Sequence, residues 1–242
     1  MLTVIDMVDG AEKSIDTKEL KGLSLTNIWL DAKDPTNEEI KILAEKLDIS
    51  LNLIKPTEIP TFSALHSLEE RLVFYFSTFE GEFNLKDLHS LAIVFSKSYV
   101  VTIRREDIQA LDRAKQHMKT RETCSPSYTV YAILDEVIRN YFNYIEIAEE
   151  KSSALEETIL KNPHEEVLGD IFKLKAKLTS LNRLLWYQRG VLHTIRRSDL
   201  PLVTETTKRY LEELIDDLTK QIDSVSVLRE VLTDATNSYR SA

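Results

Sequence analysis

Cysteine and glycine are scarce in this chain of 242 residues. Cys124 is the only cysteine, which excludes a disulfide framework and a cluster of metal-binding thiolates. The five glycines, at positions 10, 22, 81, 169 and 190, lie too far apart to form a phosphate-binding loop of the P-loop or Rossmann type. The sequence therefore carries no glycine-based nucleotide motif.

Long apolar runs are also missing. The longest stretch without a charged residue covers residues 123–134, only 12 residues, whereas a membrane-spanning helix needs about 20 mostly apolar residues. The first ten residues, MLTVIDMVDG, lack the basic and apolar regions of a signal peptide. These residues predict neither a membrane span nor a signal peptide.

Positive charge is in deficit. With 31 basic and 40 acidic residues, the chain has a formal net charge of −9. Such a charge opposes nonspecific binding of nucleic acid, which requires a basic surface, so we predict no nucleic-acid partner. It is compatible both with cationic ligands and with an acidic surface that only keeps the protein in solution.

Catalytic motifs are missing as well. His164 and Glu165 begin like a zinc-protease helix, but Leu168 occupies the position of the second histidine ligand. The five histidines are scattered, and no serine stands in a strand–turn–helix nucleophile motif. We therefore predict that the chain is not an enzyme.

An apolar seven-residue repeat fills the C-terminal half. Its spacings of three and four residues put the apolar side chains on one stripe of a helix and favour packing against other helices. Gln188 and Gln221 stand in rows that are otherwise apolar. The main rows are Leu134, Tyr141, Ala148 and Leu155; Ile171, Leu178, Leu185 and Leu192; and Leu211, Leu218, Val225, Leu232 and Tyr239.

These rows predict three long helices. Residues 128–197 are expected to form an antiparallel helical hairpin, because the connection at residues 161–163 is short. Residues 201–242 are expected to form one long helix of roughly 60 Å, at about 1.5 Å per residue, with Pro201 at or just inside its start.

The first 120 residues predict a mixed domain of strands and helices. Residues 34–39 are typical of a helix start, and the helix should bury Ile40, Leu43, Ala44 and Leu47. A second helix is expected from Asp107 to about Lys119. The expected strands, of which the last four should pair as antiparallel hairpins, are Leu2–Val8, Asn27–Asp31, Phe62–Leu68, Leu72–Phe79, Leu88–Phe95 and Tyr99–Ile103. The polar segment at residues 120–127 predicts a boundary between domains 1–122 and 123–242.

One cluster of acids stands out in the last predicted helix. Glu212, Glu213, Asp216 and Asp217 lie within two turns, and like charges four residues apart destabilise an isolated helix. A solvated acidic face is one interpretation. The other is a site for Mg²⁺ or a similar cation, which prefers carboxylate oxygens and water as ligands.

Three stretches, in this order and spacing, resemble the cytoplasmic portion of the CorA family of magnesium and cobalt channels. The first is Ile28-Trp29-Leu30-Asp31 with Asp34-Pro35-Thr36 after it, the second runs from Tyr131 to Asp135 and continues to Tyr141-Phe142, and the third runs from Leu181 to Leu192 and continues to Asp199-Leu200-Pro201.

The resemblance implies an α+β fold: an α/β/α sandwich followed by an antiparallel helical hairpin and one long stalk helix. It also implies a function. The chain would be the ion-sensing and gating domain of a homopentameric Mg²⁺/Co²⁺ channel at the cytoplasmic face of the membrane. The membrane helices, and the Gly-Met-Asn signature of the pore, would lie outside the 242 residues.

The resemblance further implies regulatory divalent cations, Mg²⁺ or Co²⁺, bound between neighbouring subunits. The family's stalk acid corresponds to Glu213 and a second acid to Asp135. Lys55 and Pro56 replace the family's acids in the sandwich domain, which leaves Glu58 as the nearest carboxylate. The full set of candidate metal ligands is Glu213, Asp217, Asp216, Asp135, Glu212 and Glu58.

Two alternatives remain open. The same domain could belong to a zinc transporter of this superfamily, since the selectivity of a channel lies largely in its pore. The helices could also form a soluble scaffold that binds a partner helix. Association that depends on Mg²⁺ or Co²⁺ would favour the sensor, and association without ions would favour the scaffold.

Overall fold

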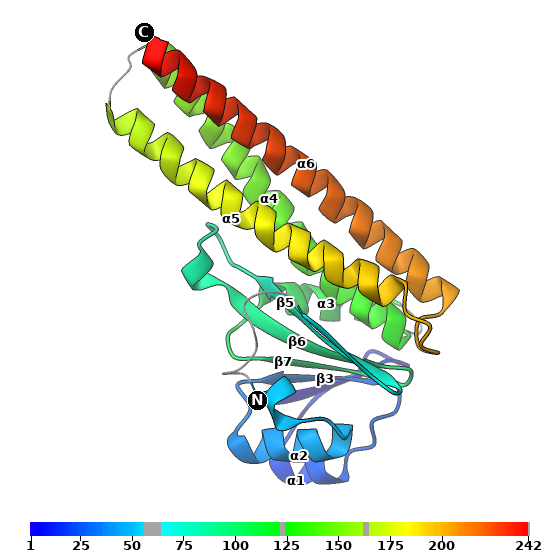
Figure 1. The fold of residues 1–242 in the computed structure, drawn as a ribbon. Coiled ribbons are helices and arrows are strands. Elements are labelled where there is room, and N and C mark those ends of the chain that lie inside the picture. The colour runs from blue at the N-terminus through cyan, green and yellow to red at the C-terminus, as the bar shows by residue number, and fades with distance from the viewer. Residues whose placement is uncertain (56–63, 122–123, 162–164, 242) are drawn as a thin grey trace.

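The computed structural model describes residues 1–55, 64–121, 124–161 and 165–241. A seven-stranded sheet carries two helices on one face, and three long helices extend from its other face (Figure 1). The α/β/α sandwich followed by a helical hairpin and one long helix is thus confirmed.

The sheet is mixed. Its spatial order is β2-β1-β3-β7-β6-β5-β4, and the pairs among the last four strands in the sequence are all antiparallel, as predicted. The central pair, β3 and β7, is parallel. The strands are β1 (Leu2–Asp6), β2 (Glu12–Ile15), β3 (Ile28–Lys33), β4 (Leu65–Leu68), β5 (Arg71–Thr78), β6 (His89–Ser96) and β7 (Tyr99–Arg104).

The strand β2 and the helix α1 (Thr17–Gly22) escaped prediction. β2 has the sequence EKSI and buries no residue, and α1 buries only Leu20, so neither shows a periodic apolar pattern. β1 also ends at Asp6, two residues before the predicted end. Of the strand predicted at Phe62–Leu68, Leu65–Leu68 is confirmed, and its first two residues lie outside the described part of the chain.

Helices α1 and α2 (Asn37–Leu47) cover one face of the sheet. The Thr36 side chain caps α2 and accepts a hydrogen bond from the backbone N–H of Glu39, whose carboxylate in turn accepts one from the N–H of Thr36. This reciprocal cap satisfies two N–H groups that a helix start otherwise leaves unpaired. The predicted inward residues Ile40, Leu43 and Leu47 are buried, whereas Ala44 is half-buried.

The other face carries α3 (Gln109–Lys119) and a buried ionic network. Asp31 accepts hydrogen bonds from Arg104 at 2.9 and 3.2 Å and from the Lys115 ammonium at 2.9 Å. Thr102 donates to the same carboxylate at 2.9 Å and accepts from the Trp29 indole at 2.8 Å. Burial by itself would raise the pKa of Asp31, but the hydrogen bonds and charge of Arg104, with Lys115 beside it, hold that pKa below its ordinary value. The network ties α3 to the two central strands.

The three long helices are α4 (Pro126–Lys161), α5 (Glu165–Arg196) and α6 (Glu205–Ser241). Both α4 and α5 pack along α6, and they meet each other over fewer residues. The predicted start at residue 201 is wrong, because Thr204 caps α6 and its hydroxyl accepts a hydrogen bond from the backbone N–H of Thr207 at 3.2 Å. Pro201 lies in the turn before the helix. The hairpin begins at Pro126, two residues earlier than predicted.

The two glutamines in the apolar rows bind backbone carbonyl groups. The Gln188 amide donates to the Ser77 carbonyl at 2.9 Å and to the Tyr141 hydroxyl at 2.7 Å, and that hydroxyl donates to the same carbonyl. The Gln221 amide on α6 donates to the Ile138 carbonyl on α4 at 3.0 Å. A polar residue in an apolar seam fixes the register of its helices. Gln188 also joins the helices to the end of β5, where Ser77 lies.

One hydrophobic core includes residues of the sheet face and of all three long helices. The division into domains 1–122 and 123–242 stays a prediction, since apolar packing continues across the boundary. In the described part of the chain, no helix combines the length and the apolar character that a bilayer span requires.

Candidate functional site

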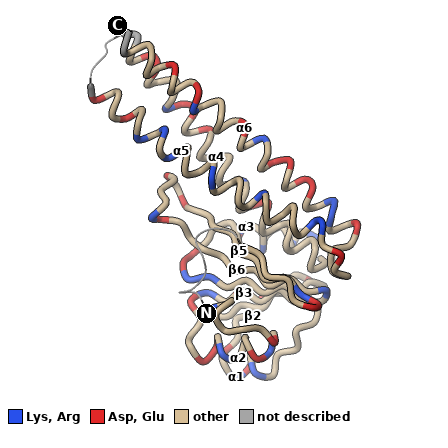
Figure 2. Tube along the Cα trace, viewed as in Figure 1, with Lys and Arg blue, Asp and Glu red and all other residues tan. Residues whose placement is uncertain are grey.

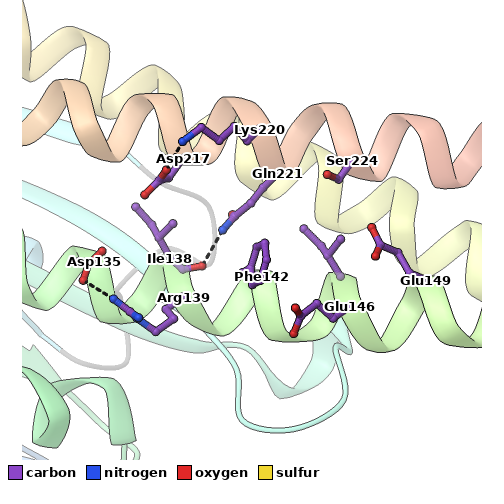
Figure 3. Close-up of a pocket in the computed structure, with 11 residues that line it drawn as sticks. Asp135, Ile138, Arg139, Phe142, Glu146, Glu149, Asp217, Lys220, Gln221 and Ser224 are labelled. Carbon is purple, nitrogen blue, oxygen red and sulfur yellow. Dashed lines mark hydrogen bonds and ion pairs between the residues drawn. The ribbon is translucent and has the colours of Figure 1, made fainter.

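A groove of about 430 Å³ runs along the seam between α4 and α6. Figure 3 shows Asp135 on α4 and Asp217 on α6 at opposite walls of this groove. The helices α4 and α6 run in the same direction, because α5, which follows α4 and precedes α6 in the sequence, runs antiparallel to both (Figure 1). Two of the predicted metal ligands, 82 positions apart in the sequence, therefore face one cavity.

Each of these acids already has a basic partner on its own helix. Asp135 pairs with Arg139 at 3.0 Å, and Asp217 pairs with Lys220 at 2.9 Å. The pairs have spacings of four and three residues. The two bases are 57% and 75% exposed, whereas Asp135 is 25% and Asp217 47% exposed. Pairs that solvent reaches contribute about 0.2–1 kcal/mol each, so a bound cation could replace either base at low cost.

Tyr131 connects Asp135 with a third candidate, Glu213. Burial, the charge of Asp135 and a hydrogen bond with Glu213 all raise the pKa of the Tyr131 phenol. The Tyr131 ring also stacks on Tyr210 of α6, with ring centroids 4.8 Å apart. Because Tyr131 is on α4 and Glu213 on α6, this aromatic contact holds the two acids on either side of one seam.

The floor of the groove combines apolar side chains with one buried amide. Gln221 is 5% exposed, and its carbonyl oxygen Oε1 has no hydrogen-bond partner among the described residues. Half of the Phe142 side chain is exposed at the groove. The groove thus has a mixed lining with carboxylates at its rim.

The remaining predicted ligands lie elsewhere. Glu212 faces α5, where Arg196 donates to its carboxylate at 2.9 Å. Asp216 is exposed and does not line the groove. Glu58 lies outside the described residues.

The groove also contains residues that sequence reasoning did not select. Arg139 and Lys220 stand one helical turn from Asp135 and Asp217, a spacing that predicts ion pairs within a helix. That signal was readable from the sequence. Figure 2 shows basic and acidic residues interspersed along the three helices.

Within residues 1–55, 64–121, 124–161 and 165–241, no three His, Cys, Asp or Glu side chains converge to hold a metal ion. Mg²⁺ commonly keeps several water ligands and needs only one or two carboxylates from the protein. An ion at the seam would therefore rely on water or on ligands from another copy of the chain.

Comparison with known proteins establishes the class. Residues 24–242 match the family model described as CorA-like Mg²⁺ transporter protein. The chain belongs to this family.

Among curated relatives, the chain is 28% identical over 245 aligned residues to the cobalt/magnesium transport protein CorA of Methanocaldococcus jannaschii. The match covers 96% of this chain and 75% of that protein. The CorA of Thermotoga maritima is 23% identical over 66% of this chain, which corresponds to 47% of the relative.

Solved structures support the fold. The soluble domain of CorA from Methanocaldococcus jannaschii superimposes with a TM-score of 0.76 at 24% identity, covering 100% of this chain and 97% of that one. The cytoplasmic domain of ZntB from Vibrio parahaemolyticus gives a TM-score of 0.78 at 12% identity, covering 99% and 96%.

Proposed function

We propose that this chain is the cytosolic ion-sensing and gating domain of a homopentameric divalent-cation channel, with Mg²⁺ and Co²⁺ as regulatory ligands. Family membership and the similarity to the soluble domain of CorA support this function. The membrane-spanning part would lie outside residues 1–242, and the domain would sit at the cytoplasmic face of the membrane.

The observation that carries the proposal is that Asp135 on α4 and Asp217 on α6 line one groove at the seam of the two helices, with Glu213 close to Tyr131 at the same seam. A cation at this seam screens the two carboxylates and favours a closed arrangement of the helices and their neighbours. When the ion leaves, like charges repel and α6 shifts, which would move the pore helix that continues from it. A ligand shifts such an equilibrium only by the difference in its affinity for the two states.

The existing ion pairs suit a sensor. Arg139 and Lys220 compete with the cation for Asp135 and Asp217, which keeps the affinity low. Low affinity is required, because a sensor must lose its ion within the concentration range of the cell.

The zinc transporter remains the second candidate, favoured by the similarity of the fold to the ZntB cytoplasmic domain. The donors at the seam are carboxylates and a phenol, with no His or Cys among the residues that line the groove. Such donors suit Mg²⁺ better than Zn²⁺, which prefers imidazole and thiolate. The seam chemistry therefore ranks the zinc function second.

Replacing Glu213 by alanine tests the proposal. In the full-length protein, Glu213→Ala should raise the Mg²⁺ concentration for half-maximal protection from limited proteolysis by about threefold to tenfold, equivalent to about 0.7–1.4 kcal/mol of lost binding free energy. Glu230→Ala is the matched control. Glu230 is also exposed on α6 but lies about 25 Å farther along the helix, at about 1.5 Å per residue.

Three outcomes separate the candidates. An unchanged midpoint for Glu213→Ala would remove this residue from the site. Protection by Zn²⁺ at concentrations where Mg²⁺ has no effect would favour the zinc transporter. Self-association without any ion, insensitive to both substitutions, would favour the scaffold.

A further inference from the structure

A second groove lies between α4 and α5. The segment after β5, residues 79–88, reaches up to these helices (Figure 1). Phe79 and Phe83 of this segment are buried. Their rings pack on Tyr144 of α4 with centroid distances of 5.7 and 5.6 Å, and Phe79 also contacts Tyr141 at 5.7 Å.

The same segment supplies a carboxylate that bridges the two helices. Glu82 binds the ammonium groups of Lys151 on α4 and of Lys177 on α5, the latter at 3.4 Å. Hydrogen bonds from Lys151 and Lys177 lower the pKa of Glu82. The segment thus places two kinds of group at this groove: aromatic rings that pack on Tyr144, and a carboxylate that binds two lysines.

Beyond the segment the groove continues as an open cavity of about 480 Å³ with the same lining. Tyr144, Leu155 and Leu174 provide apolar surface, and Leu174 and Tyr144 are themselves buried. Lys151 and Lys177 form part of the cavity wall as well as binding Glu82.

Lys173 adds a third ammonium group to this wall. The Lys173 ammonium pairs with Asp170, three residues before it on the same helix, at 3.0 Å. Three lysines face two carboxylates here, in a protein whose net charge is −9. A local excess of positive charge beside an apolar floor matches a ligand with one acidic group and an apolar body.

We propose that this α4–α5 cavity binds a small amphiphilic carboxylate, a molecule with a single carboxylate head and an aromatic or alkyl body. Its head lies among Lys151, Lys173 and Lys177, and its body covers Leu155 and Leu174. The volume is within the range of about 300–1,000 Å³ that is usual for small-molecule sites. Because Glu82 already holds two of the lysines, the ligand competes with this internal carboxylate.

Decanoate, used below its micellar concentration, tests the site by isothermal titration calorimetry. We expect the unmodified chain to bind decanoate and to bind decyltrimethylammonium, which has the same alkyl chain and the opposite charge, far more weakly. The double substitution Lys173→Gln/Lys177→Gln should weaken decanoate binding by about threefold to tenfold, as expected for the loss of two partly exposed charge contacts. Lys41→Gln, at an exposed lysine of α2, should leave binding unchanged.

Glu82→Gln gives a second test, in which the expected result is a gain of decanoate affinity. Removing the competing carboxylate frees Lys151 and Lys177, so decanoate should bind several-fold more tightly. Far-UV circular dichroism of each variant checks that the helices are intact. Equal binding of both amphiphiles, no decanoate binding at millimolar concentration, or binding that Glu82→Gln does not strengthen would each overturn the proposal.

Discussion

Replacing Asp31 by alanine is expected to lower the free energy of unfolding by about 3–5 kcal/mol, the usual cost of removing one partner from a buried ion pair. The carboxylate is 1% exposed and receives hydrogen bonds from Arg104, Lys115 and Thr102. Without it, two buried cations face each other with no charge between them. Arg104 and Lys115 are themselves 2% and 6% exposed, so both charges would remain largely shielded from solvent.

Urea unfolding followed by circular dichroism measures this loss. Asp112→Ala is the matched control, because Asp112 also lies beside Lys115, at 3.5 Å, but its side chain is 64% exposed. We expect this control to cost less than about 1 kcal/mol. Equal costs for the two substitutions would show that burial of the network does not determine its contribution.

The pH dependence supplies an independent readout for Asp31. Its pKa in the folded state is below the ordinary value, which is about 3.9 in an unfolded chain. The folded state therefore binds this proton less readily than the unfolded state, and the stability that the carboxylate contributes is complete above about pH 4 and is lost as pH falls through the folded pKa. In Asp31→Asn, the decline of stability between about pH 4 and pH 2 should be shallower than in the unmodified protein.

Asp31 also shows what the sequence can and cannot predict. Its strand was predicted from the residues around Trp29, yet its partners Arg104 and Lys115 are 73 and 84 positions away. Pairings over such separations depend on the order of the strands, and the parallel pairing of β3 with β7 could not be read from local pattern. The three helices, by contrast, were predictable because the seven-residue repeat is a local signal.

In the candidate site, too, contacts within one helix were predictable from the sequence and contacts between helices were not. Arg139 and Lys220 could have been found from helical spacing to Asp135 and Asp217. The approach of Glu213 on α6 to Tyr131 on α4 could not, because it depends on the register between the two helices. Glu212 lies between Leu211 and Glu213 in the sequence, yet it turns toward Arg196 of α5, since successive helical residues point in different directions.

Replacing Tyr141 by alanine is expected to cost about 3–5 kcal/mol, the range for removing a buried aromatic ring. The ring is fully buried and packs on Phe79, and its hydroxyl donates to the Ser77 carbonyl. Tyr141→Phe should cost only about 1 kcal/mol, because the Gln188 amide still donates to Ser77 at 2.9 Å. Phe142→Ala, at the half-exposed neighbour, should cost less than about 1 kcal/mol.

The Tyr141 variants also test whether the sheet and the helices unfold together. Trp29 lies in the sheet core and Trp186 is exposed on α5, so in a Trp186→Phe background the fluorescence reports the sheet while circular dichroism reports mainly the helices. Because the core is continuous between them, we expect both signals to change at the same urea concentration. In Tyr141→Ala the link to Ser77 is weakened, and the helices should unfold first. Coincident transitions in this variant would mean that the remaining apolar contacts are sufficient to couple the sheet to the helices.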